Sequence, residues 1–316
     1  MNTAVKWIAE PAAAQFAELK ALLVPPLAAA LQNVPAGVWQ GLQEIRLRVG
    51  QPVRLCLAEG EKTLALRWDA ALQERQLMLF LHNSVYAYEE QLRQGFVTLP
   101  GGHRVGLVGE AWFAGGRLAG FKHIASLNIR LARAVPGVAK PFLPHIVRQG
   151  RVLRTLIAAP PGVGKTTLLR DLVRSLAEGE AGLPPLNIGL ADERMEIAAA
   201  VEGVPQLAVG SRCDVISACG KAQAVMILLR SMGPQLVVTD EIGSQEDCQA
   251  LAAALNAGVS VLASAHGGSR EELLARPWLG DLLREGFFER LLLLKRLGAR
   301  LLPAAVYDKR GQSLPC

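Results

Sequence analysis

The segment that decides the fold reads Ala159-Pro160-Pro161-Gly162-Val163-Gly164-Lys165-Thr166-Thr167. It follows an apolar run typical of a strand, residues 153–158, and it opens a run with helical composition, residues 166–176. A strand, a glycine-rich loop and a helix in this order form a phosphate-binding loop. We therefore predict that the residues from Pro161 to Thr167 bind the phosphates of a nucleoside triphosphate.

The residue types in this loop suit the chemistry of phosphate binding. Gly162 and Gly164 let the backbone turn so that its N–H groups point at an anion, and the start of the next helix adds further N–H groups. Lys165 brings a positive charge to the β- and γ-phosphates, and Thr166 offers a hydroxyl to Mg²⁺. The usual pattern begins with glycine where this chain has Ala159, and we expect modest strain there rather than loss of binding.

The composition is that of a folded protein large enough for two domains. The chain has 316 residues, of which 51% are hydrophobic and 20% are charged, and these values exclude a disordered chain. The net charge of +6 fits ordinary solubility, an anionic membrane surface, nucleic acid or the nucleotide phosphates. A modest excess spread over the whole chain does not choose among these partners.

Cysteine usage and apolar runs indicate the compartment. The five cysteines include no Cys-x-x-Cys pair, so we expect neither a cysteine metal site nor a disulfide framework, and a reduced cytoplasmic setting fits best. No secretory signal is visible, and the apolar runs are far shorter than the roughly 20 residues that a membrane span needs. We expect a cytoplasmic protein that is at most peripheral to a membrane.

The first part of the chain, residues 1–140, is predicted to be a smaller α+β domain. Helical spacing is found in residues 1–35 and 68–94. Alternation of polar and apolar residues predicts strands, which cover residues 44–49, 52–56, 126–133 and two arms of a hairpin within 95–109. A linker rich in proline and glycine, near residues 135–150, separates this part from the rest.

The second part, residues 141–316, alternates strands and helices. The predicted strands cover residues 152–159, 186–192, 235–240 and 259–265. The predicted helices cover residues 165–178, 220–231, 245–257 and 269–275. This alternation is typical of an α/β fold, a parallel sheet flanked by helices on both faces. Two further runs, residues 290–297 and 299–307, are expected to add edge strands.

A second group of candidate site residues follows the apolar strand that ends before Asp240 and Glu241. The carboxyl ends of parallel strands meet at the sheet edge where ligands bind, so both carboxylates are expected beside the phosphate loop. We predict that Asp240 holds Mg²⁺ and that Glu241 polarises the water that attacks the γ-phosphate. Alone, an Asp-Glu pair in a surface turn is common, and the loop is what favours the catalytic interpretation.

Two further strand ends carry candidate residues. His266 ends the strand after Asp240 and could sense the γ-phosphate by hydrogen bonding. Asp192 and Glu193 end the strand after the first helix. They either face the nucleotide or, at Asp192, cap a helix, and both interpretations stay open.

Hydrolysis also needs a cation near the charge that develops in the transition state, often an arginine supplied by a neighbouring subunit. The candidate arginines are Arg104, Arg130, Arg133, Arg212 and Arg230, of which Arg104 and Arg230 are favoured.

Several longer motifs resemble one family, the stage III sporulation protein AA family of endospore-forming bacteria. The motifs are Glu44-Ile-Arg-Leu-Arg-Val-Gly, Gly95-Phe-Val-Thr-Leu-Pro-Gly-Gly-His-Arg-Val-Gly, Ser126-Leu-Asn-Ile-Arg, Ala191-Asp-Glu-Arg, Val204-Pro-Gln, Ser211-Arg-Cys-Asp-Val, Arg230-Ser-Met, Val238-Thr-Asp-Glu-Ile-Gly and Ala265-His-Gly. They occur in the family's order, and the likeness runs from about residue 40 to about residue 308. Ala159 is a departure from the family's loop.

The resemblance implies more than the residues do. It implies a P-loop NTPase core of the RecA/AAA type, similar to the hexameric motors of type II and type IV secretion systems, in which acidic and histidine boxes flank the nucleotide. The Asp192-Glu193 and His266 segments match those boxes. It further implies a ring with sites between subunits, on the inner, mother-cell face of a membrane. There the ring would power a channel to the forespore, built with integral-membrane sporulation proteins.

The leading hypothesis is therefore a Mg²⁺-dependent, ring-forming ATPase that drives a membrane-embedded transport complex. A second hypothesis is an ATPase stimulated by nucleic acid, suggested by Arg46, Arg48 and Arg54 on one face of the predicted first sheet. It lacks the aromatic stacking residues that single-strand binders use, which makes nucleic acid the weaker partner. A third is a scaffold that keeps nucleotide as a structural ligand, against which the Asp240-Glu241 pair argues.

Overall fold

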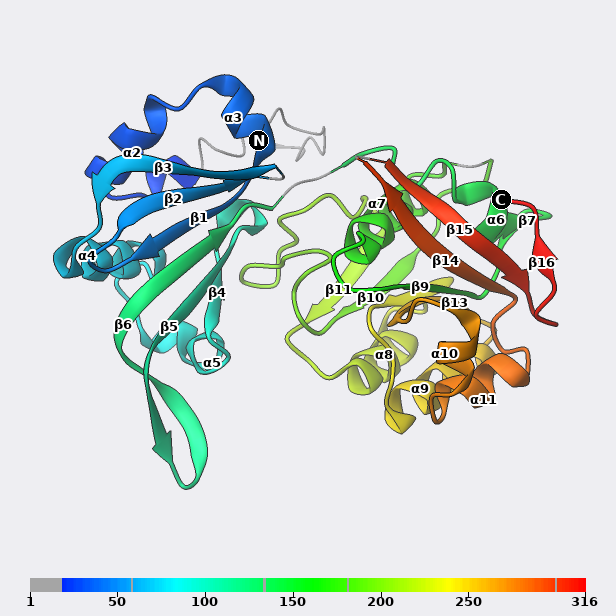
Figure 1. The fold of residues 1–316 in the computed structure, drawn as a ribbon. Helices are drawn as coiled ribbons and strands as arrows, with labels where there is room; N and C mark the ends of the chain where they lie inside the picture. Colours follow the sequence, from blue (N-terminus) through cyan, green and yellow to red (C-terminus); the bar gives the residue numbers. More distant parts are fainter. Residues whose placement is uncertain (1–18, 58, 133–134, 181, 299) are drawn as a thin grey trace, which may run out of the picture. The chain divides into compact units, whose positions relative to one another are not determined.

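The computed structural model describes residues 19–316 except positions 58, 133–134, 181 and 299. The chain divides into two compact units, Met1–Arg133 and Ala134–Cys316 (Figure 1). The domain boundary at residue 140 stays a prediction. Of the helix predicted over residues 1–35, residues 1–18 lie outside the described residues. Among the described helices, none is both long and apolar enough to cross a membrane.

The first unit is built on a six-stranded sheet in the order β3-β2-β1-β6-β5-β4, with antiparallel pairing throughout. The strands are β1 (Leu42–Arg48), β2 (Pro52–Leu57), β3 (Gly60–Arg67), β4 (Phe96–Thr98), β5 (Arg104–Ala114) and β6 (Arg117–Arg130). The helices are α2 (Pro25–Gln32), α3 (Ala36–Gly41), α4 (Ala70–Phe80) and α5 (Glu89–Arg93). Short 3-10 turns stand at Tyr86–Tyr88 and Pro100–Gly102.

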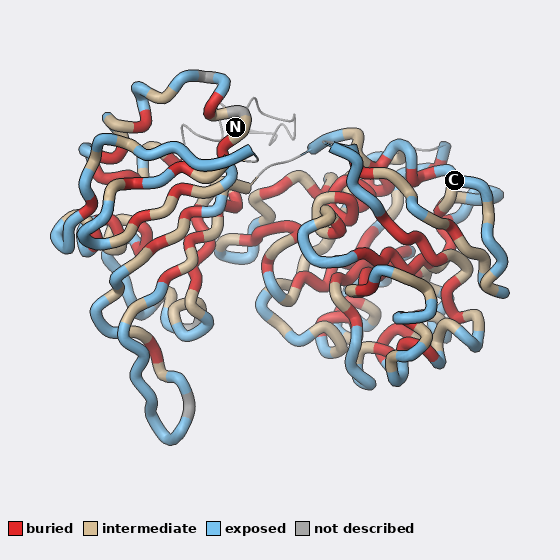
Figure 2. The backbone as a smooth tube through the Cα atoms, in the orientation of Figure 1, coloured by how far each residue is buried: buried red, intermediate tan, exposed pale blue. Residues whose placement is uncertain are grey.

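Alternation places one face of this sheet in the core. Ile45, Leu47 and Leu55 have no exposed surface, while Arg46, Arg48 and Arg54 between them lie on the other face, as predicted. Figure 2 shows the same alternation of buried and exposed positions along these strands. The hairpin predicted around Pro100 is confirmed as β4 and β5, because Phe96 to Thr98 pair with Gly106 to Arg104.

Two buried glutamines of α4 tie the helix to its surroundings. Gln73 accepts from the indole N–H of Trp68 at 2.6 Å and donates to the Ile124 carbonyl at 3.2 Å. Gln76 accepts from the backbone N–H of Val24 at 3.0 Å and donates to the carbonyl of Leu22 at 2.7 Å. Because a buried polar group must find partners inside the protein, Gln76 fixes the chain that leads into α2.

The second unit contains an eight-stranded sheet in the order β11-β10-β12-β13-β9-β14-β15-β16. The strands are β9 (Thr155–Ala159), β10 (Ile188–Asp192), β11 (Cys213–Ser217), β12 (Leu236–Thr239), β13 (Ser260–His266), β14 (Arg290–Leu297), β15 (Arg300–Asp308) and β16 (Ser313–Leu314). The first six of these are parallel, and β15 and β16 are antiparallel. A two-stranded ribbon, β7 (Val147–Arg148) with β8 (Arg151–Val152), follows the short helix α6 (Leu143–Ile146).

Helices cover both faces of this sheet, which confirms the α/β fold. They are α7 (Lys165–Ala177), α8 (Lys221–Ser231), α9 (Gln245–Asn256), α10 (Arg270–Leu274) and α11 (Leu279–Arg284). Ile157 packs in the core that contains the apolar side of α7, whereas Leu156 and Ala158 pack with α9 and α11. Val237, on β12, packs with α8. Successive residues of a strand point to opposite faces, so both faces of the sheet are buried (Figure 2).

Several strands differ from the sequence-based expectation. β14 is not an edge strand but lies between β9 and β15, because its run of leucines can be buried on both faces. β3, β11 and the two-residue strands β7 and β16 were not predicted. β3 is mostly exposed and β11 is half-buried along its whole length, so neither shows the strong apolar period by which strands are recognised.

Replacing Gln76 by Ala tests the role of this side chain. The change leaves the N–H of Val24 and the carbonyl of Leu22 without their partner, and we expect a loss of about 2 kcal/mol in the free energy of unfolding. Gln43→Ala, at an exposed position of β1, is the control and should change it by less than about 0.5 kcal/mol. Urea denaturation measures both, and equal midpoints for the two variants would contradict the assignment.

Glu289, just before β14, makes the second unit sensitive to acid. The guanidinium of Arg151 donates to both of its oxygens at 2.9 and 2.6 Å, and this lowers the pKa of Glu289 to about 2. A lowered carboxyl pKa stabilises the fold above the ordinary value of 4.5, and this contribution is lost as the pH falls toward about 2. Glu289→Gln should cost about 1 kcal/mol at pH 7. The difference should vanish near pH 2, and a constant difference across pH would refute the linkage.

Candidate functional site

The phosphate loop runs from the end of β9 to the start of α7. The backbone φ angles are +76° at Gly162 and +121° at Gly164, values that favour glycine. Within the described residues, no side chain caps the first turn of α7 and none of its residues is acidic, so its N–H groups are open to an anion. Pro161 and Gly162 are exposed, and Val163, Gly164, Thr166 and Thr167 are half-buried.

Ala159 belongs to the strand rather than to the loop. It pairs with His266 across β9 and β13, and its methyl group is buried in the core on the α7 face. Its backbone is that of a regular strand residue, so the strain predicted for this position is absent there. A glycine at this position would remove the core contact without changing the turn.

Lys165 is held in the loop by acceptors. Its Nζ donates to the carbonyl of Ala159 at 2.9 Å and to that of Pro160 at 3.4 Å, and it lies 3.0 Å from Nδ1 of His266. Burial lowers the pKa of Lys165, and the nearby charge of Glu241 opposes this shift. An anion bound in the loop would therefore replace the neutral acceptors that the Lys165 ammonium now contacts.

His266 connects Lys165 to Glu241. Lysine can only donate, so Nδ1 of His266 accepts, and Nε2 carries the proton that faces Glu241 Oε1 at 2.8 Å. The other oxygen, Glu241 Oε2, lies 2.5 Å from Nη1 of Arg194. Three strand ends therefore contribute to one chain of contacts, which we call the Lys165–His266–Glu241 chain.

Glu241 has an unusual backbone. Its φ angle is +41°, in the left-handed region that costs a non-glycine residue of order 1 kcal/mol or more. The backbone N–H of Glu241 donates to Oγ of Ser264 at 3.1 Å, and the N–H of Ile242 donates to the Ser264 carbonyl at 2.8 Å. Residues held in such conformations by neighbours are concentrated at functional sites.

Asp240 is a buried carboxyl group with an unused oxygen. It is 2% exposed, and among the described residues Oδ1 has no hydrogen-bond partner. Burial, together with the charge of Asp192, raises the pKa of Asp240 to about 7. An orphaned oxygen beside a phosphate loop fits a divalent cation, and Mg²⁺ commonly takes one or two protein oxygens plus phosphate and water. The described residues contain no ready-made cluster of three or more metal-binding side chains.

Asp192 and Glu193 are engaged elsewhere. Asp192 is fully buried and accepts three backbone N–H groups, those of Glu196, Ile197 and Ala198, at 2.8–3.1 Å. These hydrogen bonds resemble a helix cap. They cap a turn instead, because no helix begins in the described residues directly after Asp192. Glu193 forms an ion pair with Lys221 at 2.6 Å. Neither carboxylate contacts the Lys165–His266–Glu241 chain.

Of the predicted arginines that the structure describes in the second unit, Arg230 does not contact the Lys165–His266–Glu241 chain. Arg230 is exposed at the end of α8, which leads to the amino-terminal end of β12 and so to the sheet edge opposite the loop. Arg104 belongs to the first unit, where its guanidinium lies 3.6 Å from the ring centre of Phe96. Arg133 lies outside the described residues. Sequence reasoning missed Arg194, which lies two residues after the end of β10.

The chain matches a known protein family over most of its length. The family model described as "Sporulation stage III, protein AA" matches residues 18–314. The stage III sporulation protein AA of Bacillus subtilis is 42% identical over 299 residues, which cover 94% of this chain and 96% of that protein.

Solved structures show the fold. The Yersinia pseudotuberculosis ATPase DotB matches with a TM-score of 0.57 at 15% identity over 85% of this chain and 76% of that one. The pilus retraction motor PilT, solved with bound ADP, matches with a TM-score of 0.57 at 13% identity over 89% of this chain and 80% of that one. These likenesses show a P-loop ATPase fold, and the family match shows that the chain belongs to the sporulation stage III protein AA family.

Proposed function

We propose that this chain is a Mg²⁺-dependent ATPase and one subunit of a secretion-type motor. The observation that carries the proposal is the Lys165–His266–Glu241 chain, which begins at the phosphate loop and ends on a carboxylate. A nucleotide site that served only as a structural ligand would have no need of a carboxylate linked to the phosphate-binding lysine.

Each site residue has a separate role in this proposal. The loop N–H groups and Lys165 bind the β- and γ-phosphates of ATP. Thr166 and Asp240 are the residues that would hold Mg²⁺, which when bound offsets phosphate charge. Glu241 orients the attacking water and takes its proton while the bond from the γ-phosphorus to the bridging oxygen breaks, giving ADP and phosphate.

His266 couples phosphate binding to Glu241. In the structure, His266 and Arg194 engage one oxygen each of Glu241, so a water oriented by Glu241 must share an oxygen with one of these donors. When the γ-phosphate draws Lys165 away from the carbonyls of the loop, His266 loses its donor and can turn toward the phosphate. In this proposal the site stays at rest until ATP is bound.

The assembly that we propose is a homo-oligomeric ring, a hexamer, on the mother-cell face of a membrane, acting with integral-membrane components of a sporulation transport channel. Support comes from the names of the relatives, a sporulation protein and a pilus retraction motor. Arg230 lies away from the loop of its own unit, so a catalytic role for Arg230, and equally for Arg104, is proposed in trans. Asp192 and Glu193 act by positioning the segment that carries Arg194.

Nucleic acid is the weaker partner on electrostatic grounds. On the open face of the first sheet, Arg46 and Arg130 are paired with Glu44 at 2.7 and 3.1 Å, and Arg54 with Glu61 at 3.5 Å. Paired arginines release fewer counterions from a phosphate backbone than free ones, and so contribute less affinity.

Glu241→Gln tests the catalytic carboxylate. The amide keeps the size but cannot take a proton, so we expect ATP binding to persist and turnover to fall by roughly 100-fold or more. Steady-state ATPase rates at several protein concentrations, with nucleotide binding measured separately, give both quantities. Glu285→Gln, at an exposed position after α11, is the control. Turnover like that of the unmodified chain would remove Glu241 from the mechanism.

Asp240→Asn tests the metal assignment. The loss of the carboxylate charge should raise the Mg²⁺ concentration for half-maximal ATPase activity by roughly tenfold, on the order of 1.4 kcal/mol of binding free energy. Binding of ATP without Mg²⁺ should stay unchanged. A titration of activity against Mg²⁺ at fixed ATP measures the effect, and an unchanged Mg²⁺ requirement would show that Asp240 does not hold the ion.

A further inference from the structure

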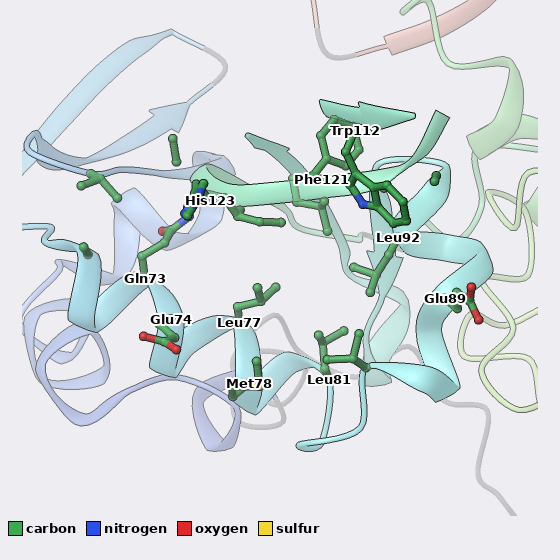
Figure 3. A pocket seen from close by; sticks show the side chains of 18 of the residues that line it. Gln73, Glu74, Leu77, Met78, Leu81, Glu89, Leu92, Trp112, Phe121 and His123 are labelled. Atoms are coloured by element: carbon green, nitrogen blue, oxygen red, sulfur yellow. The ribbon is translucent and has the colours of Figure 1, made fainter. Parts of the chain in front are cut away.

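The first unit contains an apolar groove that the proposed ATPase site does not use. Its volume is about 990 Å³, and it lies between α4, α5 and the β5–β6 hairpin. Figure 3 shows Leu77 and Met78 of α4 and Leu92 of α5 on one side, with Trp112 and Phe121 of the hairpin facing them. The groove is therefore walled by side chains from three separate elements.

A bulge directs the hairpin over this groove. The register of β5 and β6 shifts between Val108 and Glu110, and His123 has a φ angle of +46°. A Cβ atom on Gly109 would lie 2.6 Å from the carbonyl oxygen of Lys122, so the strands approach closely only because residue 109 is glycine. Bulges bend strands and redirect side chains, and this one is placed just before Trp112.

The groove exposes large apolar side chains to water. Trp112 is 42% exposed, Val85 is 45% exposed and Tyr86 is 91% exposed, and all three line the groove. Trp112 lies opposite Gly120, whose missing side chain leaves room for the indole. Contiguous exposed apolar surface with a hollow shape marks a binding surface rather than an ordinary protein face.

The charge of the groove is opposite to that of the whole chain. Among the side chains that the structure describes, the charged ones lining the groove are Glu74 and Glu89, and none is a lysine or arginine, whereas the chain carries a net charge of +6. Glu89 pairs with Arg93, and among the described residues Glu74 has no ion partner. Lys122 lies outside the lining, 5.9 Å from the ring centre of Trp112. An acidic lining disfavours anionic lipid and nucleic acid and favours a cationic partner.

We propose that this groove binds an amphipathic helix of a partner protein, with an apolar stripe flanked by lysine or arginine. Two walls of the groove are helices, and the hairpin faces it with the side chains of Trp112 and Phe121, so a helix with apolar residues at i, i+3, i+4 and i+7 matches the groove. Met78 adapts to the shape of the incoming side chains. This inference does not rest on ATP hydrolysis.

The test uses the full chain and three synthetic helical peptides labelled for fluorescence anisotropy. One peptide carries a leucine stripe with lysine flanks, the second the same stripe with glutamate flanks, and the third a scrambled order of the first. The lysine-flanked peptide should bind roughly tenfold more tightly than the other two, and its binding should weaken with added salt. Equal binding of the glutamate-flanked peptide, or no binding of the lysine-flanked one, overturns the proposal.

Matched variants locate the binding to the groove. Trp112→Ala should weaken binding of the lysine-flanked peptide by roughly tenfold, because a central aromatic anchor is lost. Phe113→Ala removes a neighbouring, 65% exposed ring outside the lining and should leave binding unchanged. Glu74→Lys should weaken binding by roughly threefold, and Glu285→Lys, in the other unit, should not. Equal effects within either pair contradict the assignment.

A measurement of molecular mass separates the partner helix from self-association. If Trp112→Ala converts an oligomer of the chain to a smaller species while the lysine-flanked peptide fails to bind the unmodified protein, a second copy covers the groove and the proposal is wrong. An unchanged mass together with weaker peptide binding supports it. ATPase activity of the isolated chain should be the same in Trp112→Ala and Phe113→Ala, so a failure of the ATPase proposal leaves this result interpretable.

Discussion

The candidate site depends on the position of β13 between β9 and β12. Ala159 pairs with His266, and Thr239 pairs with Ala263 on the same central strand. Because all three strands are parallel, their carboxyl ends lie at one edge, and the residues that follow meet there. A shift of register by one residue would turn His266 to the other face of the sheet. The Lys165–His266–Glu241 chain is thus a consequence of strand order.

Buried polar groups hold the neighbouring segment at that edge. The guanidinium of Arg170 donates to the carbonyls of Ile197 and Glu196 at 2.6 Å each, and burial lowers its pKa to about 10. Asp192 accepts three N–H groups from the same segment. Burying these charges is tolerated because each is satisfied by backbone partners. These hydrogen bonds fix the turn that follows Arg194, whose side chain contacts Glu241.

Local sequence signals were enough to predict the phosphate loop and the strands and helices with a clear hydrophobic periodicity. The α/β alternation, the Gly162–Lys165 turn and the strand-end Asp240 and Glu241 are encoded within short windows. The Arg194–Glu241 pair was not predictable, because it joins the ends of two strands whose adjacency is set by sheet order. The role of Asp192 as a turn cap and the place of β14 inside the sheet likewise depend on tertiary packing, as does the groove beneath the β5–β6 hairpin.

In the proposed mechanism, His266 transmits phosphate binding from Lys165 to Glu241. Nitrogen-15 NMR of the histidine side chains, with His266 assigned by substitution, tests it most directly. Without nucleotide, we expect Nε2 to carry a proton toward Glu241 and Nδ1 to accept from Lys165. With a non-hydrolysable ATP analogue and Mg²⁺, the Nδ1 resonance should shift as Lys165 leaves. Identical His266 spectra in the two states would contradict the account.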